Sequence, residues 1–254
     1  MYTLVSGASS GIGLELAKLF AEQKKDLILV ARSKEELNKL AEELRKKHDI
    51  SVEVIVKDLS VVGSAQELFD EVQAKNVEVE TIINNAGFGD YGKFAETSLQ
   101  KERAMMQLNM ITLTELCKLF VQPMVEKKQG TIVNVASTAA FQPGPLMAVY
   151  FATKAYVLHF SEAIQNELQD SGVHVMALCP GPTRSGFQEA ADMEASSLVQ
   201  GKIPTAKDVA EFAMAQLEKK KVVAVHGWKN KLLVFLNRTA TRNIVVNIVR
   251  KLQD

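Results

Sequence analysis

The sequence has little cysteine and no surplus of charge. Its 2 cysteines, Cys117 and Cys179, stand in apolar surroundings without metal-ligand spacing, and its 4 histidines are scattered along the chain. This pattern indicates buried thiols in a reducing compartment and predicts no zinc or other metal site. The 30 basic residues balance the 30 acidic ones, so the chain lacks the basic surface expected of a nucleic-acid-binding protein. These absences favour a protein that acts on small molecules.

Long apolar runs are also missing. No stretch approaches the ~18 apolar residues of a membrane span, and Met1 is followed directly by YTLVSG without a basic leader. We therefore expect a soluble protein of the cytoplasm. With 254 residues and 47% hydrophobic content, the chain is long enough for one large α/β domain over residues 1–254, and no internal repeat divides it.

Short apolar runs alternate with longer amphipathic segments along the whole chain. Continuous Val, Ile and Leu runs are typical of strands buried on both faces, so the pattern predicts a doubly wound (Rossmann) parallel sheet with helices on both faces. The 7 expected strands are residues 2–7, 26–31, 52–58, 79–87, 130–137, 172–180 and 222–227. The expected helices between them are residues 12–22, 34–47, 63–75, 99–127, 147–169 and 206–220.

Two long connections follow strand ends, at residues 86–98 and 180–205. Ligands of open parallel sheets bind at this edge, so both loops are expected to form a site, with residues 180–205 acting as a substrate lid. Apolar side chains on these loops indicate a hydrophobic substrate, and ordinary packing against the domain is the alternative. They are Phe88, Tyr91, Phe94, Phe187, Met193, Leu198 and Val199.

The first strand runs into a glycine-rich turn, SGASSGIG, with Gly7, Gly11 and Gly13 before an amphipathic helix. Glycines let the chain turn tightly and bring backbone N–H groups against a pyrophosphate at the positive helix N-terminus. A strand, this turn, a helix and a second strand in succession predict a dinucleotide-binding site.

The end of the second strand indicates which dinucleotide binds. An acidic residue here would hold the ribose 2′-hydroxyl of NAD. The sequence instead has Ala31, Arg32 and Ser33, which offer a charge-assisted fork and a hydroxyl suited to a 2′-phosphate. NADP(H) is therefore the expected cofactor. The alternative is that Arg32 only solvates the start of a helix.

The segment YFATK places Tyr150 and Lys154 four residues apart. On a helix this spacing puts both side chains on one face, and a phenol beside a cation ionises more easily. We expect Lys154 to lower the pKa of Tyr150 and so to help it transfer a proton. Reduction of a carbonyl places negative charge on its oxygen, which requires a proton donor and further hydrogen-bond donors.

Together with NNAG at residues 84–87 and Ser137, these motifs resemble the short-chain dehydrogenase/reductase family over nearly the whole chain. The family usually has threonine before the first glycine of the turn, where this chain has Ser6, which retains a hydroxyl. The resemblance implies that Tyr150 is the general acid/base and that Lys154 tunes it and holds the nicotinamide ribose. It implies that Ser137 binds the substrate carbonyl and that Asn109 supports a proton relay.

The resemblance also implies the cofactor contacts. The expected cofactor-binding residues are Gly7, Ser9, Ser10, Gly11, Ile12, Gly13, Arg32, Ser33, Asp58, Leu59, Asn85, Ala86, Gly87, Tyr150, Lys154, Pro180, Gly181 and Thr183. Considered alone, Ser137 has a structural alternative as a strand-end cap, and Asn109 has one as a solvent-facing helix residue.

The expected function is an NADPH-dependent reductase that interconverts a ketone or aldehyde and an alcohol, with an apolar small molecule as substrate. The alternatives are an alcohol or hydroxysteroid dehydrogenase working oxidatively and a non-catalytic NADP-sensing module. The resemblance implies a homodimer or homotetramer. The segment from Trp228 to Leu252 predicts a basic amphipathic helix within the extension 228–254. It would pack on the domain, form a subunit interface or contact an anionic membrane surface.

Overall fold

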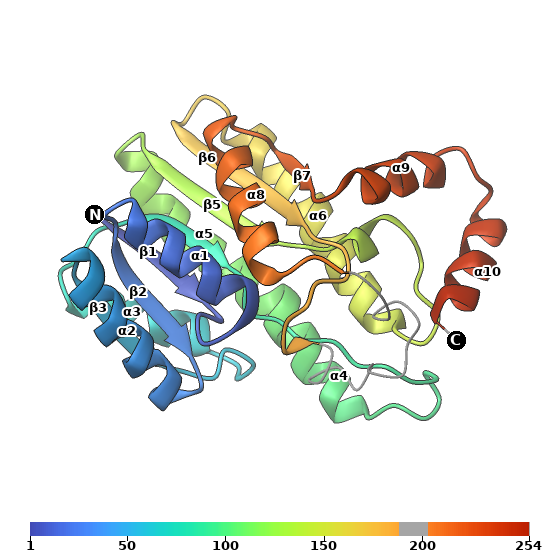
Figure 1. Ribbon diagram of the computed structural model, residues 1–254, viewed down its shortest axis with the longest axis horizontal. Helices are drawn as coiled ribbons and strands as arrows, with labels where there is room; N and C mark the ends of the chain where they lie inside the picture. Colours follow the sequence, from blue (N-terminus) through green and yellow to red (C-terminus); the bar gives the residue numbers. More distant parts are fainter. Residues whose placement is uncertain (188–202, 254) are drawn as a thin grey trace.

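The computed structural model describes residues 1–187 and 203–253. Its centre is a parallel sheet of 7 strands in the order β3-β2-β1-β4-β5-β6-β7 (Figure 1). The strands are β1 (Tyr2–Ser6), β2 (Asp26–Ala31), β3 (Val52–Val56), β4 (Val79–Asn84), β5 (Gly130–Val135), β6 (Val173–Cys179) and β7 (Val223–Val225). The middle of β2, Leu27 to Val30, is fully buried, as a strand covered on both faces requires. The predicted doubly wound fold is confirmed.

Helices cover both faces of the sheet and divide the core in two. Helices α1 (Gly11–Glu22), α2 (Lys34–His48) and α8 (Ala206–Glu218) pack on one face. Helices α3 (Ser64–Ala74), α5 (Leu113–Glu126) and α6 (Ala148–Glu167) pack on the other face. Each buries an apolar stripe against the sheet, which the 3.6-residue periodicity of the sequence anticipated.

The helix expected over residues 99–127 has a wider turn in its middle. It consists of α4 (Leu99–Met106), a π-helical segment η1 (Gln107–Thr112) and α5. A π turn holds one extra residue, which shifts the faces of the helix on either side of it. The helix predicted over residues 99–127 is therefore present, although apolar periodicity did not reveal the π turn within it.

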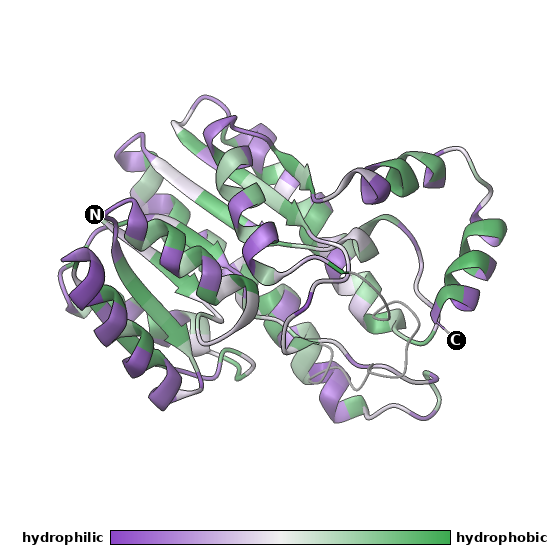
Figure 2. Cartoon of the chain, in the orientation of Figure 1, coloured by the Kyte–Doolittle hydropathy of each residue, from purple (hydrophilic) through white to green (hydrophobic). Residues whose placement is uncertain are grey.

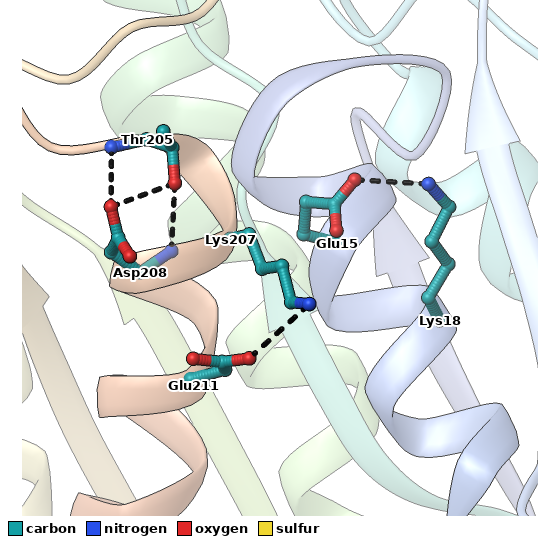
Figure 3. A network of polar contacts seen from close by, with 6 residues as sticks. All are labelled: Glu15, Lys18, Thr205, Lys207, Asp208 and Glu211. Atoms are coloured by element: carbon teal, nitrogen blue, oxygen red, sulfur yellow. Dashed lines mark hydrogen bonds and ion pairs between the residues drawn. The ribbon is translucent and has the colours of Figure 1, made fainter.

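The sheet order reverses between β1 and β4, and the connections after these strands lead to helices on opposite faces of the sheet. Ligands of doubly wound sheets bind at this switch point. The chain returns from the site to α8 through a capping box, in which the side chains of Thr205 and Asp208 bond each other's backbone N–H groups (Figure 3). Helix α8 lies beside α1, the helix that follows the glycine turn (Figure 1).

The C-terminal segment forms two helices where one was expected. They are α9 (Trp228–Asn237) and α10 (Arg242–Gln253), at the right of Figure 1. The hydroxyl of Thr239 donates to the carbonyl oxygen of Leu236 at 3.0 Å, and such a local bond competes with continued helix. Four residues separate the two helices, so the i+4 apolar spacing continues across the break and conceals it. In the described part of the chain, no helix is long and apolar enough to cross a bilayer.

Candidate active site

A cavity of about 620 Å³ opens at the carboxyl edge of the sheet. It extends from the glycine turn past the ends of β2, β4, β5 and β6 to α9 and α10. All predicted site residues line it except Gly13 and Asn109. The sequence motifs therefore converge on one continuous space, although they are spread from Gly7 to Thr183.

The glycine turn forms one end of the cavity. Gly7 and Gly11 have φ angles of +66° and +56°, a region that side-chain-bearing residues rarely adopt. A Cβ on Gly7 would also lie 2.7 Å from Nδ2 of Asn85. The first turn of α1 carries no acidic residue. In the part of the chain that the structure describes, the Ser10 hydroxyl accepts no hydrogen bond from the backbone N–H groups of this turn. The positive end of α1 therefore faces the cavity and suits an anionic phosphate.

Gly13 lies behind the cavity wall. A Cβ on Gly13 would collide with the carbonyl oxygen of Gly7, so this glycine lets α1 pack closely on the end of β1. Gly13 therefore has a packing role, and its expected cofactor contact stays a prediction.

Ser6 ties the glycine turn to the loop after β4. Its hydroxyl donates to the carbonyl oxygen of Ile83 at 3.1 Å and accepts from the backbone N–H groups of Asn85 and Ala86 at 3.0 Å each. The side chain of Asn85 donates back to the Ser6 carbonyl oxygen at 3.0 Å. A hydroxyl suffices for these contacts, so serine replaces the usual threonine without loss of them.

Arg32, Ser33 and Asp58 line the end of the cavity beside β2 and β3. Burial alone would raise the pKa of Asp58, but hydrogen bonds from Ser60 and the charge of Arg32 outweigh burial and lower it. Asp58 is therefore ionised at neutral pH, and Arg32 presents its cation nearby. This donor set fits a nucleotide with a 2′-phosphate, because a guanidinium binds phosphate oxygens in a fork.

Tyr150, Lys154 and Ser137 form one wall of the cavity. The Lys154 Nζ lies 5.8 Å from the centroid of the Tyr150 ring and donates to the carbonyl oxygen of Val135 at 2.7 Å. Ser137 follows β5 and its Oγ accepts from the backbone N–H of Ala139 at 3.1 Å, capping the short helix η2 (Thr138–Phe141). Ser137 is thus both a cap and a cavity residue.

The pKa values of this wall differ from the expectation. Burial raises the pKa of Tyr150 to about 12, and a hydrogen bond with Ser137 acts weakly in the opposite direction. Burial lowers the pKa of Lys154 to about 8. The expected lowering of the Tyr150 pKa by Lys154 is not found, because desolvation dominates and the ammonium is directed to the Val135 carbonyl oxygen.

Asn109 is buried in η1 and does not face solvent. Its Nδ2 donates to the carbonyl oxygen of Phe88 at 3.0 Å and to Oγ1 of Thr153 at 3.1 Å, and its Oδ1 accepts from the Phe88 N–H at 3.3 Å. Asn109 therefore connects the loop after β4 with the turn of α6 that carries Tyr150 and Lys154. Its part in a proton relay stays a prediction.

Two asparagines of α9 belong to the site and carried no clear signal in the sequence. Asn230 lines the cavity, donates to the carbonyl oxygen of His226 at 2.7 Å and packs against Gly181. Asn237 donates to Oε1 of Gln142 at 2.7 Å, and Gln142 also lines the cavity. Their spacing of seven residues, on one face of α9, was the available hint.

Apolar side chains line the end of the cavity that lies away from the glycine turn. They include Phe88, Met147, Phe151, Phe187, Leu233 and Val249. The ring of Phe187 lies 5.2 Å from that of Tyr150. Two expected lid residues lie elsewhere: Tyr91 donates to the Gln253 carbonyl oxygen at 2.6 Å, and Phe94 is 69% exposed. The expected lid residues Met193, Leu198 and Val199 lie outside the described residues.

Among the residues described, no three His, Cys, Asp or Glu side chains gather as a possible metal site.

Sequence comparison assigns the family. The profile described as short chain dehydrogenase matches residues 2–195 of the 254. The chain therefore belongs to the short-chain dehydrogenase family, as its motifs had indicated.

Curated relatives share this part of the chain. The very-long-chain 3-oxoacyl-CoA reductase of Anas platyrhynchos is 29% identical over 188 residues, covering 70% of this chain and 58% of the relative. The inactive hydroxysteroid dehydrogenase-like protein 1 of Homo sapiens is 31% identical over 183 residues, covering 70% and 54%. The chain thus spans little more than half the length of these relatives.

Solved structures match nearly the whole chain. A short-chain dehydrogenase from Sphingobium yanoikuyae, in complex with NADPH, is 29% identical with a TM-score of 0.84 over 94% of this chain and 93% of that one. The bulky-bulky ketone specific alcohol dehydrogenase from Comamonas testosteroni is 28% identical with a TM-score of 0.80 over 94% and 92%.

Proposed function

We propose that this protein is an NADP(H)-dependent oxidoreductase that interconverts a hydrophobic ketone or aldehyde and the corresponding alcohol. The observation that carries the proposal is the placement of Ser137, Tyr150 and Lys154 on one wall of a cavity that also contains the glycine turn and Arg32. The bound nicotinamide would supply or accept the hydride. The protein's own residues would handle the proton and the charge on the carbonyl oxygen.

Tyr150 would donate the proton during reduction. A pKa of about 12 keeps the phenol protonated at neutral pH, which is the form that a carbonyl oxygen needs as it gains charge. The Ser137 hydroxyl would donate a second hydrogen bond to the same oxygen. The raised pKa therefore suits Tyr150 to the proton-donating role in the reductive direction.

Lys154 would hold the cofactor. With a pKa of about 8 it is mostly charged at pH 7, and it lines the cavity beside Gly87. Its ammonium has three donors and uses one on Val135, so further donors remain for ribose hydroxyls.

The substrate class follows from the far end of the cavity. Aromatic and aliphatic walls exclude water and bury the apolar part of a ligand, while the few polar groups fix its carbonyl. Relatives named for 3-oxoacyl-CoA and bulky ketone substrates support a large apolar carbonyl compound.

The test is the initial rate of NADPH and NADH oxidation with aliphatic, aromatic, 3-oxoacyl and steroid carbonyl compounds. Tyr150→Phe should lower kcat/KM by about 10²- to 10⁴-fold. Tyr156→Phe is the matched control, because Tyr156 is on the same helix but bonds Thr114 outside the cavity. Equal rates in the Tyr150→Phe variant and the wild type would refute the assignment.

A non-catalytic NADP-binding role is the second candidate, because one relative is named as inactive. Saturable NADPH binding without turnover of any carbonyl compound in the panel would favour it.

A further inference from the structure

Helix α9 has an inner face fixed to the domain and an outer apolar face. Its half-buried residues, Asn230, Val234 and Asn237, recur at helical spacing on one side. At roughly 100° per residue, the opposite side carries Trp228, Leu232, Phe235 and Leu236. Trp228 and Phe235 are 71% and 62% exposed. The helix therefore presents large apolar side chains to its surroundings.

Helix α10 repeats this arrangement. Val245 and Gln253 are buried and Val249 lines the cavity, whereas Ile244 and Ile248 are exposed. Figure 2 shows hydrophobic residues along both helices at this edge of the molecule. Large apolar residues exposed together on two neighbouring helices mark an interaction surface rather than scattered surface hydrophobes.

The same segment is strongly basic. From Trp228 to Gln253 there is no acidic residue and 6 basic ones, although the whole chain has 30 of each sign. They are Lys229, Lys231, Arg238, Arg242, Arg250 and Lys251. On α9, Lys229 and Lys231 lie on either side of the apolar outer face, at roughly 100° steps from Trp228 and Leu232. The apolar surface thus has a cationic border.

The positive charge of α9 and α10 distinguishes between a second copy of the chain and a lipid surface as the partner. A second copy of the chain would bring two basic segments together, which repulsion disfavours. An anionic phospholipid surface accepts both features, because its headgroups attract lysine and arginine while its acyl boundary accepts Trp, Phe, Leu and Ile. We propose that α9 and α10 dock this protein on anionic membrane surfaces.

The docking surface is continuous with the cavity. Leu233 and Leu252 line the cavity and are also exposed on α9 and α10. Docking therefore places an apolar entrance of the cavity against the bilayer. The docking itself does not depend on the proposed oxidoreductase activity.

Trp228 provides a direct test, since it is the sole tryptophan of the chain. The full chain is mixed with vesicles of phosphatidylcholine alone or with added phosphatidylglycerol. We expect Trp228 emission to shift to shorter wavelength, and brominated acyl chains to quench it, with the anionic vesicles only.

Charge variants make the test specific. Replacing a lysine near an anionic surface lowers the partition coefficient roughly fivefold, so Lys229→Gln with Lys231→Gln should lower it roughly 25-fold. Lys46→Gln with Lys47→Gln on α2 removes the same charge at a distant exposed site and should change it less than about twofold. Equal losses in both variants, or unchanged emission with anionic vesicles, would overturn the proposal. A concentration-dependent shift without lipid would assign the surface to a second copy instead.

Discussion

At the residue scale, the site depends on two ionisable groups that burial moves in opposite directions. The pKa of Tyr150 rises to about 12 and that of Lys154 falls to about 8. Both shifts favour the neutral form of the side chain. Burial therefore keeps a proton on Tyr150 and makes Lys154 costly to hold in its charged form.

Replacement of Lys154 by methionine should stabilise the fold while removing activity. A fall in pKa from 10.5 to about 8 corresponds to a cost of about 3 kcal/mol at pH 7. The variant also loses the hydrogen bond to Val135, which stabilises the fold by about 1 kcal/mol. The free energy of unfolding should therefore rise by about 2 kcal/mol. Urea unfolding at pH 7 measures this difference.

The cost of burying charged Lys154 also determines how the free energy of unfolding depends on pH. Between pH 8 and 10.5 the unfolded chain still binds the Lys154 proton while the folded protein releases it, so wild-type stability rises with pH in this window. The advantage of Lys154→Met should shrink between pH 8 and 10.5. A Lys154→Met variant that is less stable than wild type at pH 7 would contradict the burial cost.

Arg32 is expected to discriminate between the two nicotinamide dinucleotides. A charge-assisted bond to a 2′-phosphate contributes about 1.5 to 3 kcal/mol, so Arg32→Ala should raise the Kd for NADPH by roughly 10- to 100-fold. The Kd for NADH, which lacks this phosphate, should change little. Titration calorimetry with both cofactors measures the ratio, and equal weakening of both would exclude a phosphate contact.

At the element scale, the π-helical segment η1 turns Asn109 into the core. There its side chain joins the loop after β4 to α6 through Phe88 and Thr153. Asn109 therefore acts as a positioning residue.

Asn109→Ala should destabilise the protein and slow turnover. It removes 3 hydrogen bonds, each worth about 1 kcal/mol, so the free energy of unfolding should fall by about 2 to 3 kcal/mol. Asn38→Ala, at an exposed position of α2, should stay within about 0.5 kcal/mol of wild type. Thermal unfolding of both variants tests the difference, and equal effects would assign Asn109 no special role.

The elements that sequence patterns predicted are those with strong local signals. Buried strands such as β2 read as continuous apolar runs, and the turn at Gly7 needs a positive φ angle that glycine supplies. The π turn at Asn109 and the end of α9 at Asn237 depend on tertiary packing and on single side-chain bonds. Periodicity carries no signal for them.

At the scale of the whole molecule, one cavity connects the ends of the chain. The glycine turn contributes its phosphate end, and α9 and α10 contribute its apolar end. Motif spacing predicted the first part, because the cofactor site lies at the sheet's switch point. The contribution of α9 and α10 became visible only in the structure. Self-association as a homodimer or homotetramer, and a cytoplasmic location, stay predictions.

Asn237→Ala should loosen the apolar end without affecting the cofactor. The variant loses the hydrogen bond to Gln142, which contributes about 1 kcal/mol to holding α9 beside the cavity. KM for carbonyl substrates should therefore rise roughly fivefold, while the Kd for NADPH is unchanged. Asn243→Ala, at an exposed position on α10, serves as the control. Equal KM values for the two variants would contradict the role given to α9.

The most direct test of the central claim is the fate of the hydride. The protein is incubated with NADPH in which both hydrogens of the reactive carbon are deuterium, and with the most rapidly consumed ketone of the panel. The account predicts deuterium on the carbinol carbon of the alcohol with wild type and the Tyr156→Phe variant, and little or none with Tyr150→Phe. Alcohol without deuterium, or NADPH binding without any alcohol across the panel, would contradict it.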